Sequence, residues 1–175
     1  MKRTKEGLVI KLGGSLADVA GDVLSVIATS PLPALIVPGG GAFADAVRKK
    51  NLDDDSAHWQ AISAMNHYGV YLATFGFPLT ETPDIPQRGI QILLPEKILR
   101  QTDPLPHSWD VTSDSIALWI AQNADAPLLL IKSRDGDPAD PEYIDPYFEI
   151  LNKNGKIAFS FVNGRDTAKL KAIFQ

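Results

Sequence analysis

The sequence of 175 residues contains no cysteine. This absence excludes disulfide bonds, thiolate metal sites and cysteine nucleophiles, and it is typical of proteins from a reducing compartment. The sequence also lacks an apolar run of the length that spans a membrane. Its first short apolar segment contains Lys11 and two glycines, which is unlike a signal peptide. We therefore expect a cytoplasmic protein that has no membrane partner.

Positive charge is scarce as well. The chain has 17 lysine and arginine residues against 21 aspartate and glutamate residues, for a net charge of -4. Proteins that bind nucleic acids normally carry a basic surface, so we expect no nucleic-acid partner. A chain of this length can bury a substantial core, and no repeat or low-complexity tract divides it. The sequence thus predicts a single domain over residues 1–175.

Short apolar runs alternate with segments of helical periodicity along the chain. We predict strands at residues 8–12, 34–37, 90–94, 127–131 and 156–162. We predict helices at residues 18–30, 42–50, 56–75, 95–100, 112–123 and 166–174, and a long loop at 133–146. Continuous apolar strands are typical of a parallel sheet that is covered on both faces. The expected fold class is therefore α/β, a three-layer α/β/α sandwich with a mostly parallel central sheet.

A lysine and a glycine pair stand at the end of the first strand, in the segment Lys11-Leu12-Gly13-Gly14-Ser15. Glycine amides can turn toward an anion, and the ammonium group of Lys11 can lie beside a phosphate. The segment has neither the spacing of a P-loop nor that of a dinucleotide-binding fingerprint. By itself it fits a tight strand-to-helix turn with a solvated lysine slightly better.

Three consecutive glycines, Gly39, Gly40 and Gly41, end the second strand and precede a helix. A loop that needs a positive φ would explain one glycine better than three, because each glycine costs conformational entropy. We therefore favour an anion or substrate site at the start of this helix. Together the two glycine turns predict a site that holds phosphate from two sides.

Polar residues also begin the helix at 112–123. Thr112, Ser113 and Asp114 are all residue types that cap helices. The alternative is that Asp114 contacts a lysine ammonium group or a magnesium-bound nucleotide. Spacing alone favours the cap.

A charged loop follows the most apolar strand and consists of Lys132, Ser133, Arg134, Asp135 and Gly136. Ligands of parallel α/β sheets bind beyond the carboxyl ends of the strands, so this loop is a good place for a nucleotide. An ordinary polar turn at Asp135-Gly136 is the alternative.

The long predicted helix carries His58, Ile62 and Met65 on one side. Such a stripe is more often core or subunit interface than a ligand site. An acidic run at residues 53–55 precedes His58, but acidic runs at helix starts are usually solvated. We therefore assign no metal ligand to the protein.

In their order along the chain, these segments resemble the amino acid kinase superfamily, which includes acetylglutamate, aspartate, carbamate and uridylate kinases. The glycine turns resemble the family's phosphate turns, and residues 113–117 and 129–136 resemble its helix start and its nucleotide loop. Residues 57–69 and 161–165 are similar to the small archaeal and methylotroph members linked to methanofuran biosynthesis. The chain departs from the family at Lys132 and Ser133, where threonine and an aspartate or asparagine are usual.

The resemblance implies an ATP-dependent phosphotransferase that uses Mg²⁺ and acts on a small acidic or phosphorylated acceptor, such as an aminomethylfuran-methanol phosphate. It implies that Lys11 stabilises the transferring phosphoryl group and that Asp114 orients the lysine. The implied ATP-binding residues are Gly13, Gly14, Ser15, Lys132, Ser133, Arg134, Asp135 and Gly136. The implied acceptor-binding residues are Gly39, Gly40, Gly41, His58 and Met65. The resemblance also implies a homodimer or a higher homo-oligomer.

Some alternatives stay open. The family's second positive charge has no clear match, and Lys132, Arg165 and Lys169 are the candidates. The alternative function is a non-catalytic module that binds a nucleotide or an anion in a regulatory or storage role. An oxidoreductase with a nicotinamide cofactor is disfavoured, because the glycine spacing is wrong for it.

Overall fold

The computed structural model describes residues 7–155 and 157–174. This part of the chain forms a six-stranded sheet in the order β3-β4-β2-β1-β5-β6, and every pair of neighbouring strands is parallel. The strands are β1 (Leu8–Leu12), β2 (Ala34–Pro38), β3 (Leu79–Thr80), β4 (Ile90–Leu93), β5 (Leu128–Lys132) and β6 (Phe159–Asn163). The predicted α/β class is confirmed.

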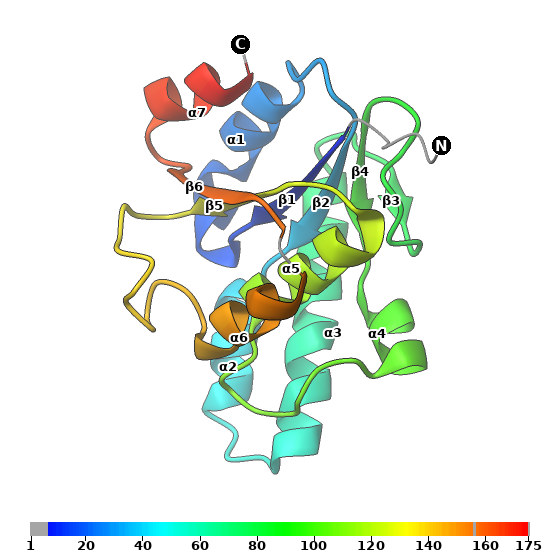
Figure 1. The fold of residues 1–175 in the computed structure, drawn as a ribbon, viewed down its shortest axis with the longest axis vertical. Helices are drawn as coiled ribbons and strands as arrows, with labels where there is room; N and C mark the ends of the chain where they lie inside the picture. Colours follow the sequence, from blue (N-terminus) through cyan, green and yellow to red (C-terminus); the bar gives the residue numbers. More distant parts are fainter. Residues whose placement is uncertain (1–6, 156, 175) are drawn as a thin grey trace.

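Helices cover both faces of the sheet (Figure 1). They are the 3-10 helix η1 (Gly14–Val19), α1 (Ala20–Ile27), α2 (Gly41–Arg48), α3 (Asp54–Ala73), α4 (Glu96–Thr102), α5 (Ser113–Ala124), α6 (Pro146–Gly155) and α7 (Thr167–Phe174). Helices α1 and α7 share one apolar cluster with the sheet, and α5 shares the other with Phe148 of α6. The sheet therefore lies between two helical layers, as the sequence predicts.

The alternation of side chains along a strand decides which residues face the site. In β1, Val9 belongs to the cluster under α5, whereas Ile10 and Leu12 belong to the cluster under α1. Lys11 shares the face of Val9 and therefore points toward α5. In β5 the same alternation places Lys132 on the face of Leu130, again toward α5. Two lysines from neighbouring strands thus converge on one helix.

The predicted elements differ from the structure in four places. The helix expected at 18–30 begins as the 3-10 turn η1 and ends at Ile27, and the short strand β3 was not predicted. The expected loop at 133–146 ends at α6, which the sequence analysis did not predict. Asp145 accepts a hydrogen bond from the Phe148 amide at 3.0 Å, so Asp145-Pro146 is a helix start with proline in the first turn. The last strand was expected from Lys156, which lies outside the described residues.

Among the helices of the described residues, none combines the length and the apolar composition that a membrane span requires.

Candidate active site

A cavity of about 590 Å³ lies beyond the carboxyl ends of β1, β2 and β5. β2 lies on one side of β1 and β5 on the other, so the cavity occupies the switch point where parallel α/β sheets bind ligands. Most of the residues singled out from the sequence line it: Lys11, Gly13, Gly14, Ser15, Gly40, Gly41, His58, Met65, Asp114, Lys132, Ser133 and Arg134. Segments far apart in the sequence therefore form one site.

Three of the expected site residues do not line this cavity. Gly39 is buried, and its amide donates to the carbonyl oxygen of Leu12 at 2.8 Å. Asp135 lies outside and pairs with Lys169 at 3.1 Å. Gly136 packs under the ring of Tyr143, where an added Cβ would lie 2.3 Å from a ring carbon. Each of these three residues thus contacts other residues of the protein and does not face the cavity.

The centre of the cavity wall is an ion-paired group of Lys11, Asp114 and Lys132. Lys11 Nζ lies 2.9 Å from Asp114 Oδ1, and Lys132 Nζ lies 2.6 Å from Asp114 Oδ2. Lys11 and Asp114 are only 6% and 4% exposed. One carboxylate therefore holds two ammonium groups at adjacent strand ends, and the group keeps one net positive charge.

Burial and charge act against each other in this group. Burial raises the pKa of Asp114, but the charges of Lys11 and Lys132 outweigh it and hold that pKa below its ordinary value. Burial and then the charge of Lys11 lower the pKa of Lys132, and Asp114 offsets this only in part. Asp114 is thus an anion at neutral pH, and Lys132 loses its proton at a lower pH than a solvated lysine.

The start of α5 resolves the alternative left open for Asp114. Thr112 is the N-cap, and its hydroxyl accepts from the Asp114 amide at 3.4 Å. The carboxylate of Asp114 instead binds the two lysines. The cap predicted from spacing is therefore Thr112, and for Asp114 that prediction is wrong. Capping and ion pairing are thus divided between Thr112 and Asp114, two residues apart.

Asp145 anchors this helix start and was not singled out from the sequence. Its Oδ2 accepts from the Thr112 amide and hydroxyl at 2.9 and 2.8 Å and from the Ser115 amide at 3.0 Å. The Ser115 hydroxyl donates to Oδ1. Burial raises the pKa of Asp145, and these donors oppose the shift. Asp145 ties the loop after β5 to the turn that presents Asp114.

The two glycine turns pack directly against each other. A Cβ on Gly14 would lie 2.2 Å from the Gly41 nitrogen, and one on Gly39 would lie 2.7 Å from the Gly14 nitrogen. Gly41 also has φ +53, and a Cβ on Gly40 would lie 2.4 Å from the Cβ of Ala44. Close packing alone thus accounts for all three consecutive glycines, so their number is not an argument for a ligand. The amides of Gly40 and Gly41 still border the cavity.

We expect Gly14→Ala to lower the stability of the protein by about 1–3 kcal/mol, the usual cost of overpacking. The new methyl group would meet backbone atoms of Gly41, which cannot move aside as a side chain can. Gly13→Ala is the matched control, because its Cβ meets nothing closer than the Ile131 oxygen at 3.1 Å. Urea unfolding measures both, and equal midpoints would contradict the packing argument.

One side of the cavity combines apolar, aromatic and charged residues. Met65 and Ile62 of α3 line it together with Trp109, and Arg48 stacks over the Trp109 ring at 4.7 Å. Burial and then the nearby His107 lower the pKa of His58 to about 4, so His58 is neutral at neutral pH. Arg48 and Trp109 were not singled out from the sequence, because neither belongs to a recognisable motif.

Tyr143 also lines the cavity and lies close to two cations. Lys132 Nζ is 5.3 Å and the Arg134 guanidinium carbon 5.4 Å from the centre of its ring. Tyr143 is 5% exposed and comes from the loop that Asp145 anchors. The ring thus contacts the cations on this side of the cavity and contributes cation–π interactions to their positions.

Of the three candidates for the second positive charge, the structure brings only Lys132 to Asp114. Arg165 binds Asp18 at 2.8 Å and Lys169 binds Asp135 at 3.1 Å, both on the exposed surface. Ammonium groups at two strand ends, with the half-buried glycines Gly14, Gly40 and Gly41 beside them, can together hold several anionic oxygens.

Comparisons with known proteins place this arrangement in a family. No protein-family model matches the chain. A relative from Methanocaldococcus jannaschii, a [5-(aminomethyl)furan-3-yl]methyl phosphate kinase, is 31% identical over 199 aligned positions, which cover 95% of this chain and 92% of the relative. The crystal structure of uridylate kinase from Archaeoglobus fulgidus has the same fold, with a TM-score of 0.61, 15% identity, and coverage of 96% and 94% of the two chains. The chain is thus a kinase that belongs to the same family as the M. jannaschii enzyme, within the amino acid kinase-like superfamily.

Proposed function

We propose that this kinase transfers the γ-phosphoryl group of ATP to the phosphate of a small acceptor in the cytoplasm. The observation that carries the proposal is the Lys11–Asp114–Lys132 group, which presents two ammonium groups at the switch point of the sheet. Phosphoryl transfer needs positioning and charge neutralisation more than covalent chemistry, and such a group supplies both.

We assign one end of the cavity to each substrate. The donor end would be formed by Gly13, Gly14, Ser15, Ser133 and Arg134, and the acceptor end by Gly40, Gly41, His58 and Met65, all of which line the cavity. In the proposed reaction the bond between the γ-phosphorus and its bridging oxygen in ATP breaks, and ADP leaves. A bond from an acceptor phosphate oxygen to the same phosphorus forms, so the product is a diphosphate.

Lys11 and Lys132 would each contact oxygens of the transferring group, where negative charge is spread in the transition state. Asp114 would hold the two ammonium groups a fixed distance apart. Without it, mutual repulsion would drive one lysine away from the other. Asp114 is therefore proposed as an orienting residue and has no proton-transfer role.

Mg²⁺ fits this site as a partner of the nucleotide. The two buried carboxylates of the cavity, Asp114 and Asp145, are already engaged by lysines and by hydrogen-bond donors. The ligands of the ion would then be phosphate oxygens and water, a coordination that Mg²⁺ commonly keeps. Mg²⁺ bound to ATP neutralises charge on the β- and γ-phosphates.

The acceptor that we propose is [5-(aminomethyl)furan-3-yl]methyl phosphate, the compound in the name of the M. jannaschii relative. Three features of the acceptor end support it. Trp109 and Met65 offer an apolar surface for a furan ring, and Arg48 offers a cation for the acceptor phosphate. Asp45 and Asp54 also line the cavity and would attract the aminomethyl cation.

Phosphorus NMR of the purified protein with Mg²⁺-ATP tests the proposal directly. We expect new diphosphate resonances with [5-(aminomethyl)furan-3-yl]methyl phosphate and far slower turnover with uridine monophosphate. Faster turnover with the nucleotide would replace the proposed acceptor. ATP binding by calorimetry, without transfer to either acceptor or to a panel of carboxylates and carbamate, would favour the non-catalytic alternative.

The pH dependence of the reaction tests the role of Lys132. Its lowered pKa means that activity should fall on the alkaline side as Lys132 loses its proton. Arginine stays protonated throughout this range, so Lys132→Arg should move the alkaline limb of kcat to higher pH, even if its maximum is reduced. Profiles of kcat between neutral pH and pH 10.5 measure the shift. Superimposable limbs would remove Lys132 from the reaction.

We further propose that the protein acts as a homodimer through α3. Val70, Tyr71 and Phe75 expose 51%, 42% and 43% of their surface on this helix and just beyond its end. Trp59 and Tyr68 also lie on α3, but they are engaged within the chain, by Arg100 and by the Gly13 carbonyl oxygen. Sedimentation as a monomer at high concentration would contradict the dimer.

A further inference from the structure

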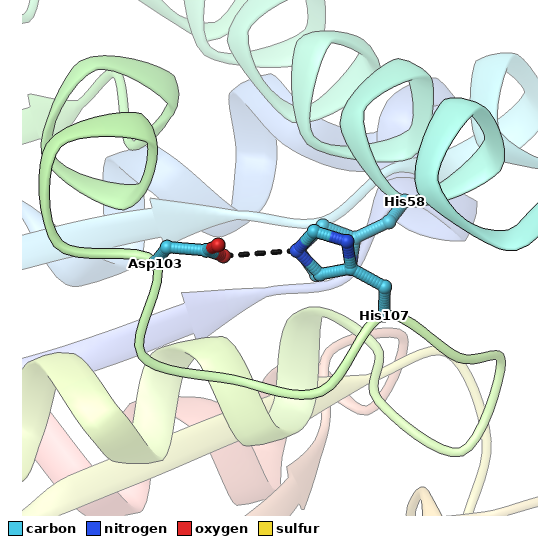
Figure 2. A group of neighbouring side chains, drawn as sticks. All are labelled: His58, Asp103 and His107. Atoms are coloured by element: carbon cyan, nitrogen blue, oxygen red, sulfur yellow. Dashed lines mark hydrogen bonds and ion pairs between the residues drawn. The ribbon is translucent and has the colours of Figure 1, made fainter.

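A cluster of two histidines and an aspartate lies at the edge of the acceptor end. His58 comes from α3, and Asp103 and His107 come from the segment that follows α4 (Figure 2). One potential ligand atom from each side chain lies within 4.8 Å of the other two. The His58 and His107 rings stack with centres 4.1 Å apart. Three metal-ligating side chains from two separate segments thus meet at one point.

The backbone of the second segment is shaped to present both of its ligands. Asp103 ends α4 in the left-handed conformation with φ 41, and its amide donates to the Leu99 carbonyl oxygen at 2.8 Å. A residue other than glycine adopts this conformation only at a cost, and the surrounding structure must hold it there. Pro104 and Pro106 restrict the chain between Asp103 and His107. The two side chains therefore face α3 in a fixed arrangement.

His107 has the hydrogen bonding that orients a metal-bound imidazole. Its Nδ1 lies 2.6 Å from Asp55 Oδ1, and its Nε2 lies 2.9 Å from Asp103 Oδ1. Histidines that bind metals usually donate the other ring N–H to a carboxylate. Asp55 makes this contact at Nδ1, which leaves Nε2 as the ligand atom on the side of Asp103. An ion bound there would displace the Nε2 proton to solvent.

We propose that His58, Asp103 and His107 bind one Zn²⁺ ion, with Asp55 orienting His107. Two imidazoles and one carboxylate are a donor set that Zn²⁺ accepts with water in the fourth position. Mg²⁺ prefers oxygen ligands, so this site is chemically separate from the magnesium that accompanies ATP. Binding would turn the His58 ring out of its stack so that a ring nitrogen faces the ion.

The ion would connect α3 to the segment that leads to Trp109. Trp109 lies two residues beyond His107 and lines the cavity, as does His58. A bridge between them would fix one wall of the acceptor end. The ring stack and the His107 hydrogen bonds hold this wall without metal, and Zn²⁺ would replace them with stronger bonds.

Calorimetry with zinc chloride, on the full-length protein after treatment with a chelator and without nucleotide, tests the site. We expect one Zn²⁺ per chain, and we expect bound Co²⁺ to give the visible absorption of a site with histidine ligands. His107→Gln and Asp103→Asn should each weaken binding by more than about 100-fold, because outer partners alone account for about 10- to 100-fold. Asp55→Asn should weaken Zn²⁺ binding by about 10- to 100-fold, because Asp55 only orients His107.

His67→Gln is the matched control, because His67 is the remaining histidine of the three in the chain and lies on the same helix outside the cluster. It should bind Zn²⁺ as the wild type does. Equal affinity of the wild type and of the folded His107→Gln variant would overturn the proposal, as would absence of binding to the wild type. If His107→Gln does not fold by circular dichroism, Asp103→Asn decides, since its side chain is 56% exposed.

Discussion

Replacing Asp114 by alanine should lower the free energy of unfolding by about 3 kcal/mol and abolish phosphoryl transfer. Asp114 is 4% exposed and is the shared partner of Lys11 and Lys132 at 2.9 and 2.6 Å. Without it, the buried ammonium group of Lys11 and the partly buried one of Lys132 repel each other with no compensating anion. Urea unfolding gives the stability, and the rate of ADP formation gives the activity.

Two further variants test whether the loss of stability comes from unpaired charge in the buried Lys11–Asp114–Lys132 group. Asp18→Ala removes the partner of Arg165 from an exposed ion pair and should lower the stability far less than Asp114→Ala, because exposed ion pairs contribute little. The double variant Asp114→Ala, Lys132→Met removes the anion and one of its two cations, so only Lys11 remains charged. It should recover part of the lost stability while activity stays absent. If Asp114→Ala is as stable as Asp18→Ala, the buried group does not hold the site together.

Lys11→Met should reduce kcat by about 100- to 1000-fold, the usual cost of removing one group that stabilises transition-state charge. The protein should stay folded, because Asp114 keeps Lys132 as its partner and methionine fills much of the volume of lysine. Steady-state kinetics with saturating ATP and acceptor measure the loss, and circular dichroism checks the fold.

Lys97→Met is the matched control for this substitution. Lys97 forms an exposed pair with Glu81 at 2.6 Å, on the surface and away from the cavity. Its kcat should equal that of the wild type. A Lys11→Met enzyme with the same kcat as Lys97→Met would remove Lys11 from the mechanism.

Apolar periodicity was enough to predict the strands that build the site. β1, β2 and β5 are buried along nearly their whole length, so their sequences are apolar runs with sharp ends, interrupted in β1 by Lys11 alone. Lys11 and Lys132 line the cavity and lie at or next to those ends, which is why both could be named from the sequence. The edge strand β3 has only two residues, neither buried, and so leaves no such pattern.

Tertiary contacts account for what the sequence did not reveal. Asp145 lies 30 residues from Ser115, and nothing local marks the hydrogen bonds that join them. His58 and His107 are even farther apart in the sequence, so no local spacing of ligand residues could indicate that their rings stack. The three glycines were assigned to a ligand because the approach of Gly14 to Gly41 is visible only in the fold. The local sequence pattern identifies where strands end, whereas contacts between residues far apart in the sequence can be identified only from the folded structure.

Lys132 is the last residue of β5, and pairing with Asn163 of β6 fixes its backbone. A charge that a sheet holds in place does not depend on the closure of a loop, so in the proposed mechanism both lysine ammonium groups would be in position before a nucleotide binds. Water, the smallest competing acceptor, would meet the same preformed site. The fidelity of the proposed reaction would then depend on the true acceptor expelling water from the cavity, and we would expect slow hydrolysis of ATP when that acceptor is absent.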